Sequence, residues 1–97
     1  MPRPRLQDAA EAGLITETAA VRLASGPLQV VARGEIVELW GPFGAPVRAL
    51  ADMEPAARQI ADAEGPGTVL DLDPEIEIED RIALVRRLVA RGWLCRT

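Results

Sequence analysis

The clearest pattern of apolar and polar positions lies in the last segment of the chain, residues 78–97. Apolar side chains recur there at helical spacing, at Ile78, Ile82, Val85 and Val89, with Leu84 and Leu88 beside them. Gly92 is typical of the residue that follows a helix, and arginines in the C-terminal half suit the helix dipole. We therefore predict a helix from Ile78 that stops at Gly92, followed by a short strand at 93–96.

Three strands are predicted in the middle of the chain. β-branched and apolar residues, partly in alternation with polar ones, mark them at Leu28–Ala32, Glu35–Trp40 and Ala45–Leu50. Arg33-Gly34 and residues 41–44 are the expected turns. Pro46 cannot donate a backbone hydrogen bond, so we expect the third strand at the edge of the sheet.

A helix is predicted between this meander and the last helix. Asp52 is its expected cap, Pro55 lies in its first turn and Gly65 ends it. Its expected apolar face consists of Ala56, Ala57, Ile60 and Ala63. Thr68–Leu70 reads as a short extended link.

The start of the chain is less regular. Apolar spacing predicts a short helix at Leu6–Leu14 after an arm that contains two prolines, and residues 16–23 permit an extended segment. We expect an arm and helix at 1–14 and a single domain at 15–97. The order of elements predicts an α+β, winged-helix-like domain: a three-stranded antiparallel meander, then helices and a terminal strand.

Composition limits the chemistry of the chain. It has 97 residues and no histidine, and all 11 of its basic residues are arginine. Without histidine, a Ser-His-Asp triad, a Cys-His pair and an imidazole metal site are excluded. Cys95 has no partner cysteine, so we expect a buried thiol in the last strand. We therefore expect a protein that is not an enzyme and uses no cofactor.

Charge and hydropathy bear on partners and location. The net charge of −4 argues against strong non-specific binding to nucleic acid. No apolar run reaches the roughly 18 residues of a membrane span, and the N-terminus lacks the apolar core of a signal peptide. We expect a cytoplasmic protein with no membrane partner.

The segment Asp71–Asp80 carries six carboxylates and leads into the last helix. A cation site is one interpretation, but the segment lacks the glycine of an EF-hand loop and contains Pro74. We favour stabilisation of the helix N-terminus by Glu77, Glu79 and Asp80, with an i,i+4 ion pair between Glu77 and Arg81. No metal is expected.

The candidate binding site is a groove between the third strand and the last helix. A sheet edge can accept a strand from an extended peptide, and arginines of the helix can pair with acidic residues of a partner. A solvated helix face and a DNA contact are the alternatives for these arginines. The residues expected to contact a protein or extended-peptide partner are Val47, Arg48, Leu50, Arg81, Leu84, Arg87, Leu88 and Arg91.

The turn at residues 39–44 carries two of the three aromatic residues of the chain, Trp40 and Phe43. They either complete a core poor in aromatic side chains or anchor a partner, because tryptophan is enriched at interface hot spots. A homodimer through Leu6–Leu14 or through Trp40–Phe43 is a further possibility.

Three segments, Val21–Leu28, Gly34–Leu39 and Asp80–Leu94, resemble the C-terminal winged-helix-like region of bacterial JmjC cupin proteins, the ribosomal oxygenases. Catalysis in that family depends on iron and 2-oxoglutarate bound at a His-x-Asp…His motif. This chain has no histidine, so no catalytic residue carries over. The resemblance implies a non-catalytic module.

The order of three strands followed by helices, together with Arg91-Gly92-Trp93-Leu94, is similar to PqqD-like elements that recognise leader peptides of ribosomally made natural products. Those elements hold the leader against their third strand and third helix. Their Leu-Asp-Gly-x-x-Thr stretch is missing, and Glu64–Thr68 is the nearest segment. We thus predict a non-catalytic interaction module, with leader-peptide recognition and DNA-binding regulation as alternatives.

Overall fold

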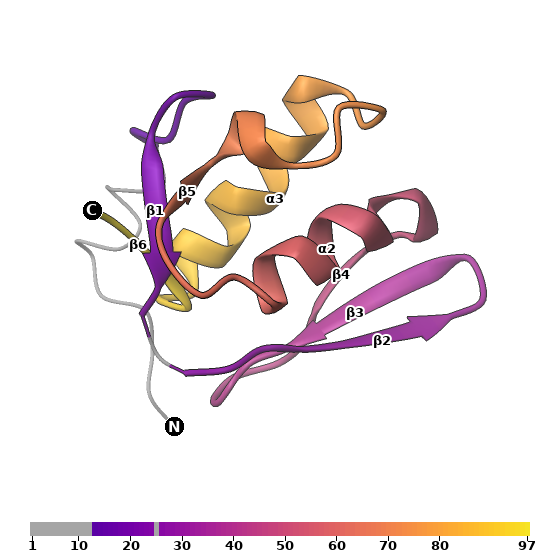
Figure 1. Cartoon of the computed structure of the whole chain (residues 1–97). Coiled ribbons are helices and arrows are strands. Elements are labelled where there is room, and N and C mark those ends of the chain that lie inside the picture. Colours follow the sequence, from indigo (N-terminus) through magenta and orange to yellow (C-terminus); the bar gives the residue numbers. More distant parts are fainter. Residues whose placement is uncertain (1–12, 25) are drawn as a thin grey trace.

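The computed structural model describes residues 13–24 and 26–97. These residues form a small α+β domain with two α-helices and two three-stranded antiparallel sheets (Figure 1). The predicted helix Leu6–Leu14 lies almost wholly in residues 1–12, outside the described part. Neither helix in the described ranges is long and apolar enough to cross a membrane.

The predicted meander is confirmed as one of the two sheets. Its strands are β2 (Gln29–Arg33), β3 (Ile36–Trp40) and β4 (Val47–Leu50), in that order across the sheet. The first turn is shifted by one residue from the prediction: Arg33 pairs with Ile36, so the two-residue loop is Gly34-Glu35. Gly34 has φ 63°, a value that suits glycine at the first loop position.

The second sheet places β1 (Ala20–Leu23) between β5 (Gly67–Thr68) and β6 (Leu94–Arg96). The sequence predicted β6 but left β1 open, because strands this short have little periodicity and are defined by their distant partners. The predicted link at 68–70 is in fact the end of β5 and the 3₁₀ turn η2 (Val69–Asp71). Cys95 lies in β6 as expected, but it is half-buried rather than buried.

The helix α2 (Glu54–Ala61) follows the 3₁₀ turn η1 (Ala51–Met53). The prediction that Asp52 caps this helix was wrong: Met53 is at the N-cap with no side-chain cap bond, because Asp52 already lies in η1. The helix also ends before Gly65, so Ala63 lies beyond it and is exposed. The other three predicted apolar residues of this face are buried.

The last helix, α3 (Ile78–Ala90), forms as predicted, and Gly92 follows it with φ 77°. Its buried face is rotated from the predicted stripe. Ile78 and Ile82 are only half-buried, whereas the buried positions are Arg81, Leu84, Val85, Leu88 and Val89. The rotation arises because α3 packs against β6 and also against β4 and η2, so a neighbouring face of the helix meets the core.

The core lies between the two sheets and the two helices. Helix α2 packs on β2, and α3 contacts both β6 and β4, so α3 joins the two sheets (Figure 1). Trp93 is fully buried directly after α3, and the ring of Phe43 meets it edge to face at 6.4 Å. This packing holds α3 beside β4, one of the two outer strands of the meander.

Candidate functional site

A groove of about 440 Å³ runs between β4 and α3. Its floor is apolar, because Leu84 and Met53 are almost fully buried beneath it. Its lining residues are Ile36, Arg48, Ala49, Leu50, Asp52, Met53, Asp80, Ala83, Leu84 and Arg87.

Within the described ranges, no strand pairs with the edge of β4 that lies beside the groove. The Ala51 N–H donates to the Glu35 carbonyl, and Ala51 directly follows β4. In the antiparallel register this bond directs the backbone groups of Val47 and Ala49 toward β3. The N–H and C=O groups of Arg48 and Leu50 therefore face away from β3, along the groove.

Two arginines, Arg87 in α3 and Arg91 at its C-cap, donate to backbone carbonyls at or next to this edge. The Arg87 Nη1 donates to the Arg48 carbonyl at 2.6 Å, and the Arg91 Nη1 donates to the Ala45 carbonyl at 2.7 Å. The Arg91 guanidinium also lies 5.5 Å from the centroid of the Trp93 ring. Within residues 13–24 and 26–97, neither arginine has a carboxylate within salt-bridge distance. Their positive charge at this end of the groove is therefore not neutralised by an ion pair with a described residue.

The other end of the groove is acidic. Helix α3 and β4 run antiparallel, since Arg87 meets Arg48 while Arg91 meets Ala45. Asp80, in the first turn of α3, thus lies at the same end as Asp52 in η1. The groove is positive at one end and negative at the other, with apolar residues between.

Arg48 is fixed by a carboxylate on the solvent face of the meander. Glu38 is only 4% exposed, and its oxygens accept from the Nε of Arg33 at 2.6 Å, the Nε of Arg48 at 3.0 Å and the Nε1 of Trp40 at 3.4 Å. The hydrogen bond from Arg48, then that from Arg33, lowers the pKa of Glu38 below its ordinary value. This network was not predicted, although the register that places Glu38 opposite Arg48 could have indicated it.

The groove brings together four of the predicted binding residues: Arg48, Leu50, Leu84 and Arg87. Arg91 lies just beyond its positive end, on Ala45. Val47 and Leu88 belong to the core beneath, with 1% and 0% exposure.

Arg81 lies away from the groove. Arg81 is buried, with 8% exposure, and its Nη1 donates to the carbonyls of Val69 and Leu72 at 3.5 and 3.3 Å. The predicted ion pair with Glu77 was therefore wrong, because the guanidinium instead donates to backbone carbonyls in and after η2. Arg86 is also engaged, since its Nε and Nη2 both donate to the Ile15 carbonyl.

The two aromatic residues of the turn have different surroundings. Trp40 is 39% exposed on the solvent face of the meander, whereas Phe43 is half-buried against Trp93.

Carboxylates of the acidic segment accept hydrogen bonds from nearby backbone groups: the Thr68 N–H donates to Asp71 Oδ2, and the Glu75 N–H donates to Asp73 Oδ1. No three acidic, cysteine or histidine side chains of the described ranges gather as a metal site.

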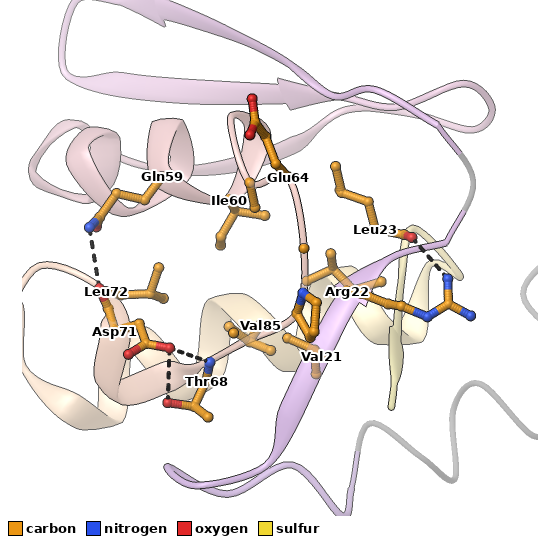
Figure 2. A pocket seen from close by; sticks show the side chains of 15 residues that line it. Val21, Arg22, Leu23, Gln59, Ile60, Glu64, Thr68, Asp71, Leu72 and Val85 are labelled. Carbon is orange, nitrogen blue, oxygen red and sulfur yellow. Dashed lines mark hydrogen bonds between the residues drawn. The ribbon is translucent and has the colours of Figure 1, made fainter.

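A second concavity of about 420 Å³ lies between β1, β5 and the end of α2 (Figure 2). Its walls are largely apolar, and several of its polar groups bind one another. Asp71 accepts from Thr68, Gln59 donates to the Asp71 carbonyl, and Arg22 contacts the Leu23 carbonyl. These bonds leave fewer polar groups to orient a ligand here than the open strand edge and uncompensated charges of the β4–α3 groove.

Asp52, Asp80 and Ala83 line the groove but were not among the predicted binding residues. A signal for two of them existed: Asp80, Ala83 and Arg87 follow one another at i, i+3 and i+7, on one helix face. Asp52 was missed because it had been assigned to the helix cap.

Comparison with known proteins adds no relative: the chain matches no family model, no curated protein and no solved structure. The two family resemblances therefore stay predictions from the sequence.

Proposed function

We propose that this domain is a non-catalytic interaction module of winged-helix-like type, which binds an extended segment of a partner protein or a peptide in the β4–α3 groove. The observation that carries the proposal is this edge of β4, which no described strand pairs with and where the backbone groups of Arg48 and Leu50 face a groove with an apolar floor. An added strand gains backbone hydrogen bonds at such an edge and side-chain contacts from the groove.

The exposed apolar surface supports the same proposal. Leu50 is 67% exposed beside the groove, although the transfer of a large apolar side chain out of water is favourable. A strand laid along β4 would cover Leu50 and contact the apolar floor of the groove.

A leader peptide of a ribosomally made natural product is one form of the proposed occupant, on the strength of the PqqD-like resemblance. A role beside a cupin oxygenase is another, on the strength of the JmjC resemblance. The DNA alternative gains no support, because Arg81 and Arg86 of α3 donate to backbone carbonyls of the fold and so do not form a cluster of available cations with Arg87 and Arg91.

The experiment is a selection of random 12-residue displayed peptides on the whole chain, followed by affinity measurements on matched variants. Ala83→Gln fills the β4–α3 groove from an exposed helix position, and Ala63→Gln makes the same change in the second concavity. We expect Ala83→Gln to weaken binding of the selected peptides by about tenfold or more and Ala63→Gln to leave it unchanged.

Two results would contradict this proposal. Selected peptides that lose affinity in Ala63→Gln but not in Ala83→Gln would assign binding to the second concavity. A selection that enriches no binding peptide would remove the peptide-binding function. Circular dichroism of both variants checks that each folds.

A further inference from the structure

We infer that the groove reads the order of charges in its occupant: a basic residue, an apolar residue two positions later and an acidic residue two positions after that, in a strand antiparallel to β4. This inference rests on the proposed function and adds to it the direction and the chemistry of the bound segment. It derives from the segregated charges of the groove.

The charges set the polarity of the occupant. Arg87 and Arg91 lie at the Arg48 end without a carboxylate partner among the described residues, and Asp52 and Asp80 lie at the opposite end. An acidic side chain is thus favoured at the first end and a basic one at the second.

The spacing follows from the two elements that form the walls. Asp80 and Arg87 are seven helix positions apart, or about 10 Å at roughly 1.5 Å per residue. In an extended strand, side chains i and i+4 point to the same side and are about 13 Å apart. The long side chain of arginine accommodates the difference between these two distances, so that residues i and i+4 reach the two charged ends. Residue i+2 then faces the apolar floor.

The direction follows from the sheet. Every described pairing in the meander is antiparallel, and a strand that continues this pattern runs in the direction from Leu50 toward Arg48. Its N-terminal side therefore meets the two aspartates, and its C-terminal side meets the arginines. The basic residue precedes the acidic one.

Arg87 couples strand addition to the acidic residue. In the free protein its Nη1 donates a hydrogen bond to the Arg48 carbonyl, the acceptor that an added strand needs. When a backbone N–H of the occupant takes this acceptor, Arg87 loses its hydrogen bond and is free to pair with a carboxylate. An occupant without an acid at this position leaves Arg87 without that compensation, so it binds more weakly.

The test uses two synthetic peptides of identical composition with blocked ends. One has Arg, Val and Glu at its first, third and fifth positions with threonine between, and the other has Glu, Val and Arg in that order. We expect the first peptide to bind about tenfold more tightly at low salt, and the difference to shrink as salt screens the charges. The double variant Arg87→Glu, Asp80→Arg should reverse the preference, with Ala83→Gln as the control for groove binding.

The possible failures separate this inference from the proposed function. If both peptides bind within about twofold of each other and both lose affinity in Ala83→Gln, the charge order is wrong and the groove function stands. If neither peptide binds while selected library peptides do bind at the groove, the charge order is again wrong. If no library peptide binds either, both proposals fall.

Discussion

The guanidinium of Arg87 lies on the backbone carbonyl of Arg48, with an Nη1–O distance of 2.6 Å, and it covers an acceptor on the open edge of the meander. Uncovered edge strands pair readily with other chains, and charged side chains on an edge prevent this. Arg87 therefore has a role in the free protein as well as in the proposed recognition: it keeps β4 available to a specific segment while hindering non-specific pairing.

Arg87→Ala should make the chain self-associate more strongly than the unchanged protein, because the Arg48 carbonyl then loses the charged side chain of α3 that covers it. Sedimentation velocity over a range of concentrations measures the association. Arg58→Ala is the matched control, since Arg58 donates to Glu54 of its own helix α2 and not to a strand carbonyl. Equal association of the two variants would contradict the covering role of Arg87.

Substitution of Leu88 should affect folding and substitution of Leu50 should affect binding, although both were predicted as binding residues. Leu88 is fully buried, so Leu88→Ala should lower the free energy of unfolding by about 2–5 kcal/mol. Leu50 is 67% exposed, so Leu50→Ala should change stability by less than about 0.5 kcal/mol while it weakens peptide binding. Urea unfolding and peptide titration of the two variants measure both effects; a large stability loss in Leu50→Ala would mean that this side chain belongs to the core.

Local sequence patterns predict some elements of this fold but not the contacts between distant segments. The meander, α3 and its glycine stop follow from local periodicity and turn chemistry, so they were predictable. The pairing of β1 with β5 and β6 joins short segments more than 40 residues apart, and no local pattern encodes it. A concavity does lie between β4 and α3, the two elements that the sequence analysis names. The rotation of α3 that buries Arg81 depends on packing against η2, which periodicity does not contain.

Gly41 should tolerate no side chain, because it lies directly against the indole ring of the buried Trp93. A Cβ atom at Gly41 would overlap three carbons of that ring, whereas a Cβ at Gly65 would meet no atom within 4 Å. Gly41→Ala should therefore destabilise the fold by about 1–3 kcal/mol through overpacking, and Gly65→Ala should be close to neutral. Thermal and urea unfolding of the two variants give the comparison, and similar midpoints would show that Trp93 can move aside.

Arg86 should hold the segment before β1 on α3. Its two hydrogen bonds to the Ile15 carbonyl join positions 71 residues apart, and the Ile15 side chain is fully buried. Arg86→Met keeps the aliphatic length but removes both donors, so we expect a loss of about 1–3 kcal/mol. Hydrogen exchange should become faster in residues 15–19 in particular. Arg58→Met, which breaks an exposed i,i+4 pair, should cost at most about 0.5 kcal/mol; a larger loss there than in Arg86→Met would contradict the assigned role.

Glu38 should make the fold sensitive to acid. Its pKa is lowered in the folded protein by the hydrogen bonds from Arg48 and Arg33, whereas in the unfolded chain it has the ordinary value of about 4.3. A carboxyl group with a lowered folded-state pKa contributes stability above the unfolded-state pKa, and this contribution disappears as the pH falls through the folded-state pKa. Glu38→Gln should therefore unfold at a lower temperature than the unchanged chain at pH 7, and this difference should narrow toward pH 3. Glu35→Gln, at an exposed turn position, is the control. If Glu38→Gln lowers the midpoint equally at pH 7 and pH 3, the effect is one of packing, and the charge of Glu38 does not contribute.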